Sequence, residues 1–65
     1  MTFEQMEDAA IRAEQRADYR AAVQLYLLAA NQPVGIERKL RCNTAALRAN
    51  VELFRQTARA GERAA

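Results

Sequence analysis

The stretch ADYRAAVQLYLLAA, residues 17–30, decides the fold of this chain. Apart from Asp18, Arg20 and Gln24, it consists of alanine, aromatic and branched apolar residues. It is too short to cross a membrane, and its composition favours a helix. A helix that is apolar on nearly all sides belongs inside a structure, with other elements covering it. We therefore expect a central helix over residues 19–31, with Asp18 as its N-cap.

A second helix is predicted before this stretch, over residues 3–16. Thr2 followed by Gln5 has the spacing of a capping box, in which each side chain binds a backbone N–H of the first turn. Apolar residues then recur at spacings of three and four, and most of them are alanines. Small side chains on this stripe would let a neighbouring helix approach closely. Residues 3–31 should therefore form a short helical hairpin.

The third predicted helix covers residues 36–60. The segment NQPVG, residues 31–35, should form a turn, because Pro33 cannot continue a helical hydrogen-bond ladder. Nothing then interrupts the helix before Gly61, and we expect residues 61–65 to form a frayed tail. About 25 residues at roughly 1.5 Å each give about 37 Å, against about 21 Å for the first helix. The third helix should therefore extend beyond the hairpin.

Apolar residues along the third helix follow the 4-3-4-3-4 spacing of a heptad repeat. If this seam is longer than the hairpin that could cover it, apolar surface remains in water, which a second copy of the chain could bury. We therefore predict an all-α fold, a single domain built as a short helical hairpin followed by a long third helix, and a homodimer. The heptad seam consists of Leu40, Thr44, Leu47, Val51, Phe54 and Ala58.

The size of the chain supports association. A single core in 65 residues is marginally stable without disulfides, metal ions or oligomerisation. Cys42 is the only cysteine and there is no histidine, so we expect neither an internal disulfide nor a metal site. Self-association or a protein partner is the support that remains. The N-terminal residues do not resemble a secretion signal, and we expect a cytoplasmic protein.

Charge is divided unevenly along the chain. Residues 1–35 hold three arginines and five carboxylates, a net charge of −2, whereas residues 36–65 hold six arginines, one lysine and three carboxylates, a net charge of +4. This asymmetry indicates oriented association rather than a uniformly basic coat for nucleic acid. Arg41, Arg48 and Arg55, the arginine row, lie seven residues apart beside the heptad seam. They could form a solvated edge, or they could contact an acidic protein surface or a phosphate backbone.

Two other classes of function are weaker predictions. A DNA-reading helix needs polar side chains for base edges, and the central helix has almost none. Direct DNA binding by the basic third helix therefore stays an alternative, as does a structural assembly module. We expect no enzyme and no cofactor, because there is no histidine base and Cys42 has no catalytic partner. Cys42 should be a buried or incidental thiol, although neighbouring Arg38, Lys39 and Arg41 could lower its pKa.

From Ala10 to Ala29 the chain has the pattern Ala-x-x-Ala-Glu-x-x-Ala-x-Tyr-x-x-Ala-x-x-Leu-Tyr-x-x-Ala. This pattern resembles that of the ANR family, small bacterial and phage-borne negative regulators of AraC-type transcription activators. Ala17 stands where that family usually has glycine, and Tyr26 stands where it usually has tryptophan. The same stretch is similar to the helical hairpins of tetratricopeptide repeats and of microtubule-interacting-and-transport domains. The residues that carry the resemblance, and the expected packing motif of the hairpin, are Glu14, Ala17, Tyr19, Ala22, Tyr26 and Ala29.

The resemblance implies a function that the residues alone do not indicate. It implies a small inhibitor, or anti-activator, of a transcription regulator, which would occlude the dimerisation or DNA-binding surface of its target. A phage-encoded protein directed at a host regulator is a close variant. In either case the heptad seam would supply affinity, and the arginine row would set orientation.

Overall fold

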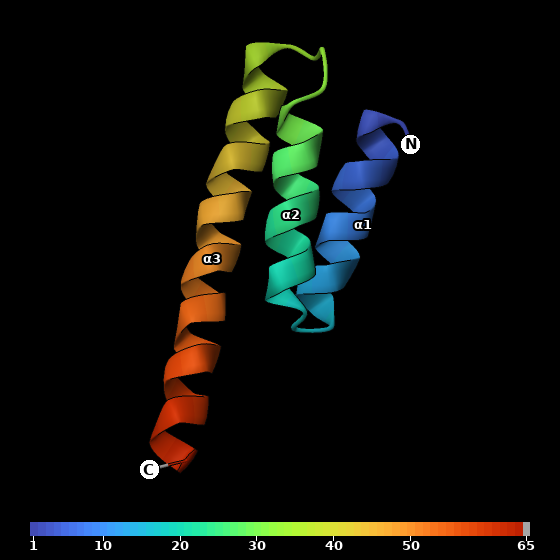
Figure 1. The fold of residues 1–65 in the computed structure, drawn as a ribbon. Coiled ribbons are helices and arrows are strands. Elements are labelled where there is room, and N and C mark those ends of the chain that lie inside the picture. The colour runs from blue at the N-terminus through green and yellow to red at the C-terminus, as the bar shows by residue number, and fades with distance from the viewer. Residues whose placement is uncertain (65) are drawn as a thin grey trace.

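The computed structural model describes the backbone of residues 1–64 and the side-chain surroundings of residues 1–62. It contains three helices, α1 over Phe3–Gln15, α2 over Tyr19–Ala30 and α3 over Ile36–Ala64 (Figure 1). The predicted all-α fold, a short helical hairpin followed by a long third helix, is confirmed.

The predicted end of the third helix is wrong. α3 continues through Gly61 to Ala64, because glycine lowers helix propensity without breaking the hydrogen-bond ladder. Ala65, the last residue of the expected frayed tail, lies outside the described residues.

The ends of the first two helices follow the sequence signals. Thr2 and Gln5 form the complete capping box, and the Asp18 carboxylate accepts the Ala21 backbone N–H at 3.4 Å. Between α1 and α2 the chain reverses at Ala17, whose φ of 61° lies in the left-handed region. The next N–H, that of Asp18, donates to the Ala13 carbonyl at 2.8 Å. This is a helix C-terminus of the kind that glycine usually forms.

The three helices lie in a row, with α2 in the middle (Figure 1). α2 runs antiparallel to both neighbours, so α1 and α3 point in the same direction. Small side chains dominate the core and let the helices approach closely, while three larger side chains fill the space between them. The buried residues are Phe3, Met6, Ala10, Ala13, Ala22, Tyr26, Ala29, Ala30, Cys42, Ala45, Ala46 and Ala49.

α3 extends past the hairpin, as predicted (Figure 1). The Gln56 amide donates to the Ala17 carbonyl at 3.1 Å, which places Gln56 level with the turn between α1 and α2. The helix after Gln56 therefore overhangs the hairpin. Among the described residues, no helix combines the length and hydropathy that crossing a membrane requires.

Candidate functional site

The heptad seam lies entirely on the exposed outer face of α3. Leu40, Leu47, Val51 and Phe54 are 57%, 69%, 49% and 74% exposed, and Thr44 and Ala58 are also exposed. Large apolar side chains that line up along one helix face are typical of a surface that another protein covers.

The hairpin covers a different face of α3 from the one we expected. Its contact with α3 is made by the packing face, which consists of Cys42, Ala45, Ala46 and Ala49. At 100° per residue, this face lies on the opposite side of the helix from the heptad seam. The expectation that the seam is exposed only where α3 outreaches the hairpin is therefore wrong. Small residues allow close packing on α2, which leaves the larger side chains on the outside along the whole helix.

The arginine row is bound by carboxylates of the same chain. Arg41 holds Glu7 through two hydrogen bonds of 2.7 and 3.0 Å, and Arg48 holds Glu14 through two of 3.3 and 2.8 Å. Arg55 pairs with a carboxylate one turn earlier on its own helix. The acidic first half of the sequence thus meets the basic second half inside one chain. The charge asymmetry that we interpreted as a sign of association is largely matched by these intrachain pairs.

A polar cluster connects all three helices at the centre of the molecule. Tyr26, which is only 3% exposed, donates its hydroxyl proton to the carboxylate of Glu14, and Arg48 binds the same carboxylate from α3. The hydrogen bonds from Arg48 hold the pKa of Glu14 below its ordinary value, with the Tyr26 hydroxyl adding to the effect against the cost of burial. Burial, followed by the bond to Glu14, raises the pKa of Tyr26. In this cluster Glu14 therefore stays charged and Tyr26 stays neutral, so the role of the cluster is to hold the three helices together.

Cys42 is buried, as predicted, and its surroundings oppose reactivity. Burial raises the pKa of the thiol, and the nearby Glu7 carboxylate raises it further, which outweighs the effect of Arg41. The neighbouring Arg41 therefore does not bring the pKa of Cys42 below its ordinary value.

The hairpin motif is assembled around Tyr26. Ala22 and Ala29 are buried one turn away on either side of it, and Glu14 receives its hydroxyl group. Tyr19 is half-buried against the same core, whereas Ala17 is exposed and has a role in the backbone of the turn. The residues of the hairpin motif therefore serve to pack the helices and to form the turn between α1 and α2.

Two surface features beside the heptad seam were missed in the sequence. Ile36 is 67% exposed one turn before Leu40, and its spacing of four could have extended the seam. On the opposite flank of the seam from the arginine row, a groove of about 410 Å³ lies between α2 and α3. A groove that joins two helices has no signal in a single sequence. It is lined by Val23, Leu27, Asn43, Ala46, Leu47 and Asn50.

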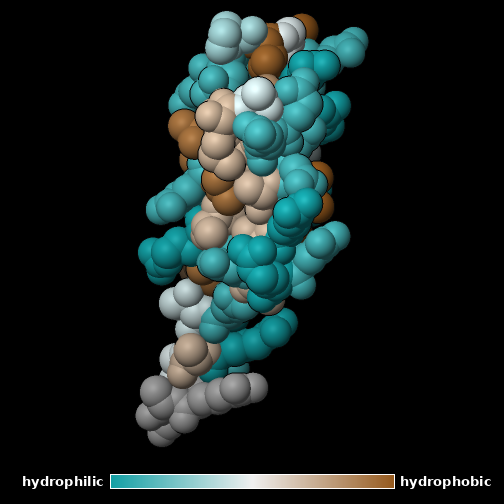
Figure 2. All heavy atoms as spheres, turned by 90° about the vertical axis from the view of Figure 1, so that its right-hand side faces the viewer, coloured by the Kyte–Doolittle hydropathy of each residue, from teal (hydrophilic) through white to brown (hydrophobic). Residues whose placement is uncertain are grey.

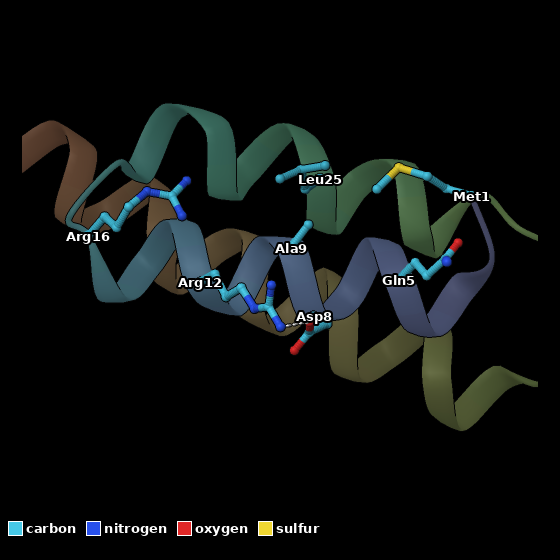
Figure 3. A pocket seen from close by; sticks show the side chains of 7 residues that line it. All are labelled: Met1, Gln5, Asp8, Ala9, Arg12, Arg16 and Leu25. Atoms are coloured by element: carbon cyan, nitrogen blue, oxygen red, sulfur yellow. Dashed lines mark ion pairs between the residues drawn. The ribbon is translucent and has the colours of Figure 1, made fainter.

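Two further hollows lie against α1. The larger, about 490 Å³, is open and lies between α1 and α2, where Arg12 is paired with Asp8 and Arg16 points over the opening (Figure 3). The smaller, about 320 Å³, lies beside the arginine pairs. The face on the α1 side is largely hydrophilic, with a narrow strip of weakly hydrophobic residues down its middle (Figure 2).

Within residues 1–62, no three histidine, cysteine or acidic side chains lie close enough together to hold a metal ion. Comparisons with protein-family models, with curated proteins and with solved structures find no match for this chain.

Proposed function

We propose that this chain is a small non-enzymatic regulatory protein that acts by protein–protein binding, with the heptad seam as its contact surface. One observation carries the proposal. Leu40, Leu47, Val51 and Phe54 are between half and three-quarters exposed on a single face, although the same helix has a separate face for its own core. Desolvating these side chains against a partner would supply the affinity.

The arginine row would orient the partner. Arg41 and Arg48 keep about 58% and 59% of their side chains exposed while they hold Glu7 and Glu14. Because each guanidinium already has a carboxylate, the row presents donors with little net charge. This favours a protein surface over a phosphate backbone, whose binding depends on uncompensated positive charge.

The proposed target is a transcription regulator, which the chain would inhibit by covering its dimerisation or DNA-binding surface. This part of the proposal rests on the resemblance of residues 10–29 to the ANR family. The chain would also pair with itself through α3. A phage-encoded inhibitor of a host regulator would work by the same physical means.

A promoter–reporter assay with a co-expressed AraC-type activator tests the function. We expect the wild-type chain to lower reporter output and Leu47→Lys to restore it, because a lysine in the seam has to be desolvated on binding. Leu28→Lys is the matched control, since Leu28 is 46% exposed on α2 and lies outside the seam.

Unchanged output with the wild-type chain, across a panel of such activators, would contradict the anti-activator function. Equal loss of inhibition in both lysine variants would contradict the role of the seam. Retardation of duplex DNA by the purified chain, with a strong dependence on salt, would favour direct DNA binding instead.

A further inference from the structure

α1 and α3 lie parallel with a constant offset of 34 residues. Three ion pairs connect them, and in each pair the two residue numbers differ by 34. A residue on α1 therefore corresponds to the residue 34 positions later on α3. The same number is the repeat length of tetratricopeptide helical hairpins, in which each helix packs against its neighbours in sequence. The ion pairs are Glu4–Arg38, Glu7–Arg41 and Glu14–Arg48.

This correspondence relates the first half of the heptad seam on α3 to the buried face of α1. Phe3, Met6, Ala10 and Ala13 are the residues by which α1 is buried in the core that it shares with α2. The counterparts of the last three, 34 positions later, are Leu40, Thr44 and Leu47, whereas Phe3 corresponds to Glu37, outside the seam. The seam thus occupies on α3 the positions that α1 uses to contact an antiparallel helix. On α3 these positions are exposed, because α3 contacts α2 with its packing face.

We propose that the occupant of the heptad seam is α3 of a second copy of this chain, packed antiparallel, with residue i opposite residue 98 − i. The inference rests on the proposed function of the seam as a contact surface: the second copy covers the seam of the free chain, and the target regulator would compete for the same surface. A twofold axis would cross each α3 at the level of Ala49.

The sizes of the seam residues favour this orientation. In the antiparallel pair, Leu47 lies opposite Val51, the small Thr44 opposite the large Phe54, and Leu40 opposite Ala58 of the second copy. Each layer then combines a larger side chain with a smaller one, which fills the space between the helices evenly. A parallel pair would place each residue opposite its own copy, which gives one layer of two phenylalanines and another of two alanines.

The flanks of the seam are compatible with the pair. Asn50 lies on one flank next to the twofold axis, where it would meet Asn50 of the second copy, and amide side chains both donate and accept hydrogen bonds. Asn50 is exposed, so its amide is accessible to a second copy. On the other flank Arg48 would approach its own copy, but each Arg48 is bound to Glu14, which reduces the repulsion.

The hairpins leave room for the second copy. Each hairpin covers the packing face, which is opposite the seam, so both hairpins lie on the outside of the paired α3 helices. Residues 36–58 span roughly 34 Å, and half the circumference of a helix about 10 Å wide is roughly 15 Å. About 500 Å² per chain, or roughly 1,000 Å² in total, would be buried, which reaches the lower end of specific interfaces.

The distance between two spin labels tests the pairing. Glu62 is exposed and follows the last seam residue, so the spin label is attached at Glu62→Cys. One labelled variant also carries Cys42→Ala, and a second keeps the buried Cys42. At about 1.5 Å per residue, antiparallel helices place the two labelled backbone positions roughly 40 Å apart. Parallel helices would place them roughly 10 Å apart. Double electron–electron resonance distinguishes the two distances.

We expect the longer distance, its loss in Leu47→Lys and its retention in Leu28→Lys. The short distance, the absence of any dipolar signal in both labelled variants, or a signal that Leu47→Lys leaves unchanged would each overturn the inference. Inhibition in the reporter assay combined with no dipolar signal would overturn self-pairing alone and leave the proposed function in place.

Discussion

Tyr26 on α2 donates its hydroxyl proton to Glu14 on α1, and the same carboxylate receives Arg48 from α3. The Glu14 carboxylate thereby connects the hairpin to the helix that carries the heptad seam. The contact between Tyr26, Glu14 and Arg48 lies at the border between the core, which consists mostly of alanine, and the exposed arginine pairs. With this contact made, the packing face of α3 points inward and the heptad seam points outward.

Replacing Tyr26 by phenylalanine should destabilise the fold by roughly 1–2 kcal/mol, because a buried hydrogen bond to a charged acceptor is lost while the ring remains. Urea unfolding measures the change. Tyr19→Phe is the matched control, since Tyr19 is half-buried and its hydroxyl makes no hydrogen bond within the described side chains. Equal destabilisation by both variants would mean that the hydrogen bond to Glu14 contributes no more to stability than the Tyr19 hydroxyl does.

The cluster also predicts how stability depends on pH. Arg48 lowers the pKa of Glu14 in the folded chain, so this group stabilises the fold above its ordinary pKa of 4.5, and the stabilisation is lost as the pH falls through the lower folded value. Glu14→Gln should therefore be less stable than wild type at neutral pH, and the difference should shrink in acid. Urea unfolding midpoints of both chains as a function of pH provide the measurement, with the exposed Glu62→Gln as control. A difference that stays constant down to pH values below the lowered pKa would contradict the assignment.

Glycine in place of Ala17 should stabilise the chain by roughly 0.5–1 kcal/mol. Ala17 has a φ of 61°, a conformation that costs an L side chain about 1 kcal/mol or more and costs glycine little. Ala9→Gly in the middle of α1 should have the opposite sign, because glycine there only adds chain entropy to the unfolded state. A lower melting temperature for Ala17→Gly would show that the turn does not hold this conformation in solution.

Cys42 should react slowly with alkylating reagents. Its thiol is buried and its pKa is raised by burial and by Glu7, so the reaction needs local opening of the fold. We expect the rate in native buffer to be at least about tenfold lower than in urea. A cysteine introduced at the exposed position Arg20, in a Cys42→Ala chain, should react at similar rates in both. Fast native labelling of Cys42 would disagree with its placement in the core.

The sequence predicted the helices and their order because caps, turn residues and apolar spacing are local signals. Thr2 and Asp18 each directly precede the helix that they cap, and Pro33 lies in the turn between α2 and α3. The choice between the two apolar faces of α3 was not predictable in the same way. Leucine, valine and phenylalanine carry the larger hydrophobic signal, yet the alanines and Cys42 face the hairpin, since the core is thin and α2 comes close. That choice depends on tertiary packing, which a single sequence does not display.

The pairing of the arginine row with carboxylates of the same chain was also not predictable from the sequence. Arg41 and Glu7 lie 34 residues apart, and only the parallel arrangement of α1 and α3 brings them within 2.7 Å. Their distances in sequence suggested separate acidic and basic regions that are available to partners. The structure pairs them within the chain, which leaves the apolar seam as the part of α3 that still lacks a partner.

Sedimentation equilibrium from micromolar to millimolar concentration is the most direct test of the claim that the heptad seam pairs with a second copy. We expect a mass that rises to twice the chain mass of 7.3 kDa for wild type and for Leu28→Lys, and that stays at the chain mass for Leu47→Lys. A mass that remains that of one chain for the wild-type protein over the whole range, or a Leu47→Lys variant that associates as wild type does, would contradict the account.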